Sequence, residues 1–333
     1  MIHVKDLCKE FKSAKREAGF KGSLKGLFSR AYEIKKAVEN ISFDVAEGEI
    51  VGYIGSNGAG KSTTIKMMTG ILMPTSGECT INGIVPFKNR QTNAKQIGVV
   101  FGQRTQLWWD LPLTETFTIL KEIYNVSETD FKNRMEFFNE VLDIPSFVKS
   151  QVRTLSLGQR MRADLAASLL HNPKVLFLDE PTIGLDVVVK DRMRKAIKDI
   201  NKEFNTTVIL TTHDLVDIEE LCSRIIIIDT GKKVYDGDLK QIKDTYGYMS
   251  SVDIEVKNPD KVEDIDFNAH FSLSKDDLSS GIENNILKIR FNKNKISVGD
   301  IAAVAFQHAY VLDMSISGTD ITEIIKNIYE KGV

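Results

Sequence analysis

A short stretch near position 55 combines glycines, hydroxyls and a single lysine in an order that suits phosphate binding. From Ile54 to Thr64 the sequence reads I-G-S-N-G-A-G-K-S-T-T, with the spacing G-x-x-x-x-G-K-S from Gly55 to Ser62. In such a loop, glycines let successive backbone N–H groups face an anion, the lysine reaches the terminal phosphates, and the serine hydroxyl can bind Mg²⁺. The residues expected to contact a nucleotide here are Ser56, Asn57, Gly58, Ala59, Gly60, Lys61, Ser62 and Thr63.

The residues on either side of this loop predict the elements that position it. The apolar run E-I-V-G-Y-I before the loop is typical of a buried strand, and Ile65, Met68 and Leu72 after it follow helical spacing. A strand–loop–helix order places the N-terminus of the helix, with its positive dipole end, at the anion. The sequence therefore predicts a nucleotide-binding loop.

Two further apolar runs are also followed by side chains that can take part in chemistry. Val175–Leu178 precedes Asp179 and Glu180, and Val208–Leu210 comes shortly before His213. Short apolar runs of this kind are typical of strands buried in a parallel sheet. Because ligands of open α/β sheets bind beyond the carboxyl ends of the strands, we expect the glycine loop, the two carboxylates and the histidine to meet at one site.

The rest of the chain predicts how its domains are arranged. Residues 110–170 have the pattern of an inserted helical lobe, and a late hairpin that starts at Ile225 has Gly231 in its turn. We predict one large domain over residues 1–238. A small α+β domain is predicted over residues 239–333, outside the nucleotide site and serving dimer contact or regulation.

The composition limits the class of protein. The 333 residues carry 44 basic and 46 acidic side chains, with a pI near 6.3. A protein whose main partner is nucleic acid usually has a basic surplus, so we expect no nucleic acid partner. Cys8, Cys79 and Cys222 are few and widely spaced, as in proteins with reduced cytoplasmic thiols. No apolar stretch approaches the ~18 residues of a membrane span, so any membrane role is expected to depend on a partner.

Several motifs together resemble the ATP-binding subunits of ABC transporters over about residues 1–238. G-S-N-G-A-G-K-S is similar to the Walker A motif of that family, V-L-F-L-D-E to its Walker B motif with the following glutamate, and L-S-L-G-Q to its signature motif. P-T-I-G-L-D resembles the D-loop, T-T-H-D resembles the segment of the switch histidine, and Gln103 falls at the glutamine of the Q-loop. The fold class that we predict is α/β: a phosphate-loop NTPase core with a parallel sheet, an inserted helical lobe and a small C-terminal α+β domain.

The resemblance also implies roles for the motif residues in converting ATP and water to ADP and phosphate. Lys61, Gln103, Glu180 and His213 are the expected catalytic residues, with Glu180 orienting the attacking water. Ser62, Gln103 and Asp179 are expected to hold Mg²⁺. An aromatic side chain normally stacks on the adenine; Phe11 is preferred here, and Tyr32 competes with it.

A second subunit is implied as well. By resemblance, Ser156, Gly158, Gln159 and Asp186 contact the ATP held by the glycine loop of another ATP-binding subunit, either a second copy or a related chain. The usual signature is L-S-G-G-Q, and this chain has Leu157 in place of the first glycine, which affects how that loop packs. The working unit is therefore expected to be a head-to-tail dimer.

The function implied is that of the ATP-hydrolysing subunit of a membrane transporter. The segment F-G-Q-R-T-Q-L-W-W-D-L-P and the C-terminal domain resemble bacterial exporters of drugs, lipids, glycans or peptides whose permease is a separate chain. Such a subunit lies at the cytoplasmic face of the plasma membrane, held there by the permease. The alternative is a soluble ABC-type ATPase of translation or DNA repair. A small-molecule kinase does not explain L-S-L-G-Q and T-T-H-D.

Two features fall outside these motifs. The insertion Lys12–Lys36 is rich in lysine and arginine and predicts a basic amphipathic helix, either on a membrane or partner surface or packed on the domain; its apolar face would carry Phe20, Leu24, Leu27, Phe28 and Ala31. Trp108 and Trp109, the only tryptophans, follow Gln103 closely. We expect at least one indole to help form a permease-docking groove, the alternative being that both pack inside the helical lobe.

Overall fold

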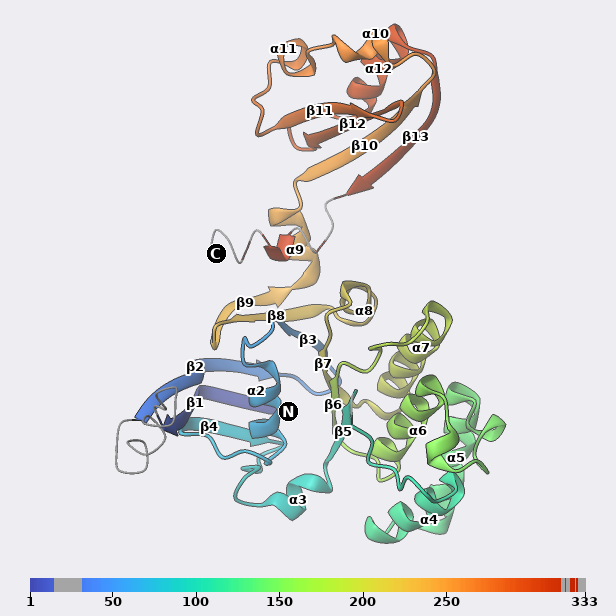
Figure 1. The fold of residues 1–333 in the computed structure, drawn as a ribbon. Coiled ribbons are helices and arrows are strands. Elements are labelled where there is room, and N and C mark those ends of the chain that lie inside the picture. The colour runs from blue at the N-terminus through green and yellow to red at the C-terminus, as the bar shows by residue number, and fades with distance from the viewer. Residues whose placement is uncertain (15–31, 103, 319–320, 322–323, 327, 329–333) are drawn as a thin grey trace, which may run out of the picture. The chain divides into compact units, whose positions relative to one another are not determined.

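The computed structural model describes residues 1–14, 32–102, 104–318, 321, 324–326 and 328. These residues form two compact units, which comprise residues 1–237 and 238–333 (Figure 1). None of the helices in the described ranges is both long enough and apolar enough to span a bilayer.

The first unit is organised around a six-stranded sheet. Its strands, in order across the sheet, are β5 (Ile97–Phe101), β6 (Val175–Asp179), β7 (Thr207–Thr211), β3 (Ile50–Gly55), β8 (Arg224–Asp229) and β9 (Lys232–Asp238). The pairs from β5 to β8 are parallel. Residues 225–228 and 175–178 are buried without alternation, as expected for strands covered on both faces. The predicted parallel strands are confirmed.

Helices connect these strands. The helix α7 (Val187–Phe204) joins β6 to β7, and α8 (Leu215–Leu221) joins β7 to β8. The buried face of α7 includes Met193, Ile197 and Ile200, which recur at helical spacing. This arrangement brings the carboxyl ends of β3, β6 and β7 to the same edge of the sheet.

The predicted helical lobe is present between β5 and β6 (Figure 1). It consists of α4 (Leu113–Ile123), α5 (Glu128–Leu142), the short 3₁₀ helices η1 (Ile144–Ser146) and η2 (Val152–Thr154), and α6 (Leu157–Leu169). Ser127 caps α5 by accepting a hydrogen bond from the backbone N–H of Asp130.

A three-stranded antiparallel sheet completes the first unit. Its order is β2 (Tyr32–Val45), β1 (Ile2–Ala14), β4 (Ser76–Ile81). Helix α2 (Lys61–Met68) contributes Ile65, Met67 and Met68 to one apolar core shared by this sheet and the six-stranded sheet. The short helix α3 (Arg90–Ala94) precedes β5. The glycine loop is therefore anchored at both ends in a packed core.

The predicted helix over 12–36 is wrong at both of its ends. Strands β1 and β2 continue to pair as far as Ala14 and Tyr32, so residues 12–14 and 32–36 are the arms of a hairpin. Pairing of the two strands satisfies the backbone hydrogen-bonding groups of both arms. The helical spacing of the side chains gives no indication of this pairing. Residues 15–31, with Phe20, Leu24, Leu27, Phe28 and Ala31, lie outside the described residues.

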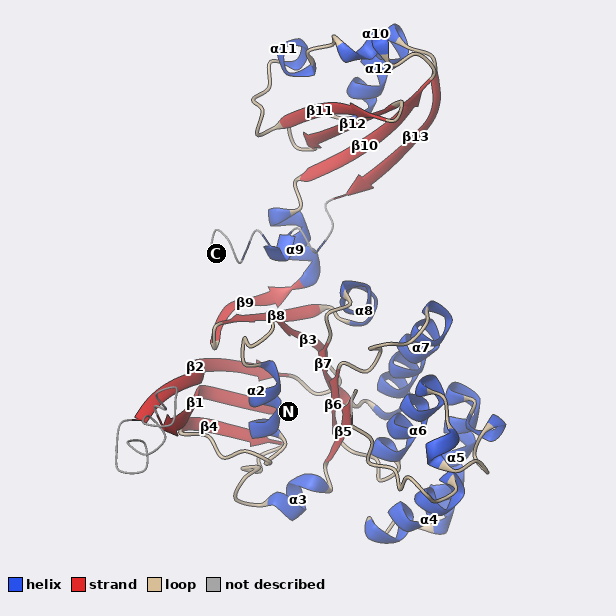
Figure 2. Ribbon diagram, viewed as in Figure 1, coloured by secondary structure: helices blue, strands red, loops and turns tan. Residues whose placement is uncertain are grey.

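The second unit has an antiparallel sheet with helices, which confirms the predicted α+β architecture (Figure 2). It consists of α9 (Leu239–Tyr246), β10 (Met249–Val256), α10 (Asp260–Glu263), α11 (Phe267–Phe271), β11 (Leu278–Glu283), β12 (Ile286–Asn292), α12 (Val298–His308) and β13 (Val311–Gly318). The strand order is β11-β12-β10-β13. Alternate residues such as Leu287 and Ile289 pack against Ile301 of α12, as the period of two predicts.

Candidate nucleotide site

The glycine loop connects β3 to α2 and needs glycine at its end. Gly60 has a φ of 108°, in the left-handed region, and precedes the first helical residue, Lys61. A Cβ at Gly60 would lie 2.5 Å from the carbonyl oxygen of Ala37. Both the backbone conformation and the close approach of β2 therefore require a residue without a side chain. The loop turns directly into the N-terminus of α2, which favours an anion.

Lys61 is held against this loop. Its Nζ donates hydrogen bonds to the carbonyl oxygens of Gly55, at 2.5 Å, and Ser56, at 3.3 Å. Burial lowers the pKa of the Lys61 ammonium, while the nearby carboxylates of Glu180 and Asp179 oppose that effect. The loop thus carries a fixed cation that faces two acidic side chains.

Asp179 and Glu180 occupy the end of β6. The Thr211 hydroxyl on the neighbouring strand donates a 2.5 Å hydrogen bond to Oδ1 of Asp179. Glu180 has a φ of 58°, a left-handed conformation that is uncommon for a residue with a side chain. Its backbone N–H is fixed by a 2.9 Å bond to the carbonyl oxygen of Thr211. Such backbone strain is found preferentially at functional sites.

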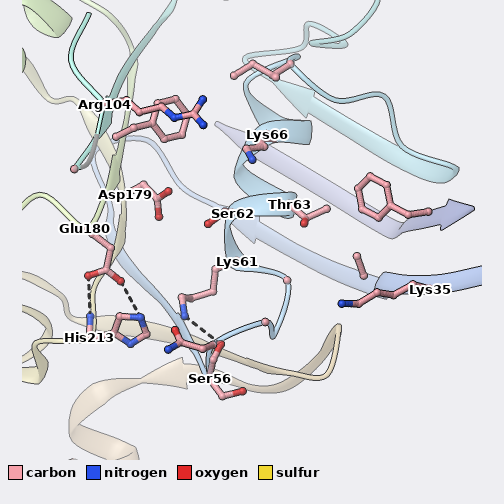
Figure 3. Close-up of a pocket in the computed structure, with 18 residues that line it drawn as sticks. Lys35, Ser56, Lys61, Ser62, Thr63, Lys66, Arg104, Asp179, Glu180 and His213 are labelled. Carbon is pink, nitrogen blue, oxygen red and sulfur yellow. Dashed lines mark hydrogen bonds and ion pairs between the residues drawn. The ribbon is translucent and has the colours of Figure 1, made fainter. Parts of the chain in front are cut away.

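The Glu180 side chain lies against His213. Its Oε2 accepts a 3.3 Å hydrogen bond from the backbone N–H of His213, and its Oε1 lies 3.2 Å from Nε2 of the same residue (Figure 3). Oε1 is buried and accepts no hydrogen bond from any described residue. Burial raises the pKa of the Glu180 carboxyl above its ordinary value, and His213 opposes the shift. A buried carboxylate with unused acceptor capacity and a raised pKa is suited to hold or accept a proton.

A network buried behind these residues holds them in place. Asp217 of α8 is fully buried, and its Oδ2 accepts hydrogen bonds from the hydroxyls of Thr182, at 2.5 Å, and Thr212, at 3.1 Å. Its Oδ1 accepts a 2.8 Å bond from Arg194 of α7. Thr182 follows Glu180 by two residues and Thr212 directly precedes His213, so one carboxylate ties together the backbone on both sides of the site.

The loop, the carboxylates and the histidine border one cavity of about 710 Å³ (Figure 3). The predicted residues that line it are Phe11, Ser56, Asn57, Gly58, Gly60, Lys61, Ser62, Thr63, Asp179, Glu180 and His213. Ala59 does not line it, because its side chain is buried in the core. Gln103 lies outside the described residues.

The cavity also contains residues that the sequence interpretation missed. They are Lys35, Ala37, Lys66, Ile71, Phe101, Gly102 and Arg104. Lys35 lies opposite Phe11 in the β1–β2 ladder. Only the pairing of these strands could have placed that lysine beside the predicted adenine-stacking ring. Phe11 itself is 42% exposed, which leaves its ring accessible from the cavity, and the side chain of Tyr32 is outside the described set.

Besides Ala59, four predicted residues do not line the cavity of their own chain. Ser156 caps α6 through a reciprocal pair of hydrogen bonds with Gln159, at 3.2 and 2.9 Å. Asp186 caps α7 by accepting a 3.0 Å bond from the backbone N–H of Val189. A Cβ at Gly158 would lie 2.9 Å from Cγ1 of Val189, so the glycine allows α6 and α7 to approach closely.

The fold and the site define a class of protein. A glycine loop between a buried strand and a helix, with Lys61 facing the acidic end of a parallel strand, is the arrangement of a phosphate-loop NTPase. Residues 38–183 match the family model described as ABC transporter.

Known proteins identify the family more closely. The chain is 33% identical over 219 residues to an uncharacterized ABC transporter ATP-binding protein of Methanocaldococcus jannaschii, covering 66% of this chain and 78% of that protein. It is 35% identical over 205 residues to the linearmycin resistance ATP-binding protein LnrL of Bacillus subtilis, covering 62% of this chain and 65% of LnrL. A solved dimeric ATP-binding cassette in a post-hydrolysis state, bound to ADP and Pi, matches with a TM-score of 0.59 and 26% identity, covering 72% of this chain and 99% of that one.

This chain belongs to the ATP-binding proteins of ABC transporters, and it is an ABC-type ATPase. The predicted family and fold class are therefore confirmed, and a soluble ATPase of translation or DNA repair is not favoured.

Proposed function

We propose that this chain hydrolyses ATP to drive an exporter whose membrane-spanning permease is a separate chain. The observation that carries the proposal is the meeting of Lys61, Asp179, Glu180 and His213 at one cavity beside the glycine loop. Phosphoryl transfer to water depends on positioning and on electrostatic stabilisation of the phosphates, and these groups supply both.

The glycine loop and Lys61 are proposed to bind the phosphates. Lys61 donates to the carbonyl oxygens of Gly55 and Ser56, and these bonds can be exchanged for stronger bonds to phosphate oxygens. Ser62 and Asp179 line the same cavity and offer the oxygen ligands that Mg²⁺ prefers. We propose that they hold Mg²⁺, with Gln103 as a third ligand. The ion would neutralise charge on the phosphates.

Glu180 is proposed to orient the attacking water and accept its proton, so that ATP and water yield ADP and phosphate. The strained backbone and the bond from the His213 N–H hold its carboxylate in one place. His213 is proposed to contact the γ-phosphate from the adjacent strand end. Phe11 is proposed to stack on the adenine, because its exposed ring lines the cavity.

We further propose a head-to-tail dimer in which Ser156, Gly158, Gln159 and Asp186 complete the site of a second subunit. Support comes from their position outside the cavity of their own chain and from the dimeric state of the similar cassette. The Ser156 hydroxyl accepts a bond from Gln159 and keeps its own proton for an outside acceptor. The N-terminus of α6 adds a dipole that favours phosphate.

The partner in the membrane is proposed to be a permease that docks beside Trp108 and Trp109. Both indoles are partly exposed, by 38% and 49%, although large aromatic side chains are usually buried. Linearmycin resistance, named for one relative, supports export as the direction. The subunit would then lie at the cytoplasmic face of the plasma membrane. Residues 239–333 are proposed to serve dimer contact or regulation.

Purification of the full-length chain from membranes of its native cells tests this function. We expect an integral membrane protein to co-purify and the complex in lipid vesicles to hydrolyse ATP. The Lys61→Ala variant should retain the membrane protein but lose turnover. Recovery of the chain in the soluble fraction alone, or bound to ribosomes or DNA-repair proteins, would contradict the transport function.

A further inference from the structure

The segment that follows Gln103 is fastened to one residue of helix α6. The hydroxyl of Thr105 and the backbone N–H of Gln106 both donate to Oδ1 of Asp164, at 2.9 and 3.1 Å. The side-chain amide of Gln106 donates to the carbonyl oxygen of Asp164 at 3.1 Å. The backbone N–H of Leu107 in turn donates to the Thr105 hydroxyl at 3.1 Å. Three successive loop residues are therefore linked to a single helical position.

Asp164 is buried, and burial strengthens its hydrogen bonds to the loop. Its residue is only 3% exposed, and burial raises the pKa of its carboxyl to about 6, against the lowering effect of the bonds from Gln106 and Thr105. A buried carboxylate that loses its donors is left unsatisfied at a high free-energy cost. Sliding of α6 past the loop would incur that cost, so the two segments are favoured to move together.

The same face of α6 connects Asp164 to the predicted signature residues. Ser156, Arg160 and Asp164 are spaced four residues apart and therefore lie in one row along the helix. The Arg160 guanidinium lies 5.6 Å from the ring centroid of Trp109. At the start of the lobe, the backbone N–H of Arg153 donates to the carbonyl oxygen of Trp109 at 3.0 Å. The loop thus runs beside α6 from Asp164 to the N-terminal end of the helix.

We propose that Asp164 is a positioning residue that fastens residues 105–107 to α6, so that the loop with Trp108 and Trp109 follows the displacements of the helix that begins at the signature motif. The proposal rests on the proposed function, because it assigns permease docking to the loop and contact with the ATP of a second subunit to Ser156 and Gly158. It makes α6 the connection between nucleotide engagement and the permease.

Four variants separate this role from a general loss of stability. Asp164→Ala removes the acceptor, and Thr105→Val removes one donor. Asp164→Asn retains an oxygen in the position of Oδ1, which alone accepts both bonds, so it should preserve the link. Thr118→Val is the matched control, because among the described residues the Thr118 hydroxyl donates only to the Thr114 carbonyl oxygen, within its own helix of the same lobe.

Hydrogen exchange of the full-length chain tests the link without a permease. Exchange over residues 104–107 should accelerate by at least about tenfold in Asp164→Ala and Thr105→Val. Asp164→Asn and Thr118→Val should remain at the parental rate. Parental protection in Asp164→Ala would show that the carboxylate does not hold the loop.

ATP turnover with and without the permease tests the coupling. In Asp164→Ala the stimulation by the permease should fall by about fivefold or more, while the KM for ATP of the isolated subunit stays unchanged, and Asp164→Asn should restore it. Equal loss of basal and stimulated rates, or full stimulation in Asp164→Ala, would overturn the proposal.

If the parental subunit binds no permease, the proposed function fails, and tryptophan fluorescence then tests the coupling. Two proteins are then compared: the Glu180→Gln variant, and the same variant that also carries Asp164→Ala. Added ATP should change the indole emission of the first and leave that of the second unchanged. A change in both proteins, or in neither, overturns the proposal.

Discussion

Replacement of Asp217 by alanine should lower the stability of the ATP-binding unit more than replacement of an exposed charged residue would. The side chain is fully buried, with its two oxygens accepting three bonds from Arg194, Thr182 and Thr212. Removing one member of a buried ion pair typically costs about 3–5 kcal/mol, because the remaining charge stays buried. Arg194 keeps ion pairs with Asp191 and Glu220, which are more exposed, so we expect the lower end of that range, about 3 kcal/mol.

This magnitude can be measured as a shift in melting temperature. For a unit of 150–250 residues, 1 kcal/mol lowers Tm by about 2–4 °C, so Asp217→Ala should lower it by about 6–12 °C. Tryptophan fluorescence is a suitable probe, because Trp108 and Trp109 are the only tryptophans and both lie in the first unit. Asp217→Asn, which keeps the size of the side chain, should give an intermediate shift.

Glu136→Ala, at an exposed position of α5, serves as the control and should change Tm by no more than about 2 °C. A shift below about 3 °C for Asp217→Ala would refute the reasoning, since it would mean that the network contributes no more than a surface interaction. Because Thr182 and Thr212 flank Glu180 and His213, the folded variant should also lose part of its kcat.

Four further predictions concern the nucleotide site and the proposed docking segment. Lys61→Ala should abolish steady-state ATP turnover because the phosphates lose their fixed cation, and parental turnover would contradict the assignment. Glu180→Gln should bind ATP but stall hydrolysis, so an ATP-bound dimer should accumulate and be detected by light scattering. In the parent protein, turnover should fall as the pH decreases, with a midpoint above 4.5, the ordinary pKa of a glutamate carboxyl. The reason is that burial raises the pKa of Glu180 and that its ionised form is required. An acid limb at or below 4.5 would argue against Glu180 as the base. Phe11→Ala should raise the KM for ATP by about tenfold, by loss of stacking worth about 1–1.5 kcal/mol, and an unchanged KM would remove Phe11 from the adenine site. Trp108→Ala and Trp109→Ala should weaken co-purification of the permease while ATP binding is retained; unchanged co-purification in both variants would assign the indoles to the lobe alone.

Local patterns were enough to predict the centre of the site. The spacing of the glycine loop reflects two requirements: the backbone must turn inward at Gly60, and a helix must begin at Lys61. Both requirements depend on residues adjacent in the sequence. The apolar runs before Asp179 and His213 predicted strands because both faces of a parallel sheet are covered. Once those strands share a sheet, their carboxyl ends meet, so the convergence of the acidic pair with the loop followed from the sequence as well.

Sequence patterns failed where pairing across the chain sets the outcome. The side chains at 12–36 follow helical spacing, yet 12–14 and 32–36 are strands, because the backbone groups of β1 and β2 pair with each other. The same pairing brings Lys35 opposite Phe11 and into the cavity, which no spacing along the chain could indicate.

The buried carboxylates were decided by tertiary structure alone. Asp164 and Asp217 occur in helical segments with no motif that marks them, and an isolated aspartate in a helix is normally solvated. Their donors come from residues 105–106 in one case and from Arg194, Thr182 and Thr212 in the other. The sequence by itself determined the family, the phosphate loop and the acidic strand end, because each depends on neighbours in the chain. The fastening of α6 to the loop and of α8 to the site was settled by packing, because a buried charge is stable only where distant segments deliver its partners.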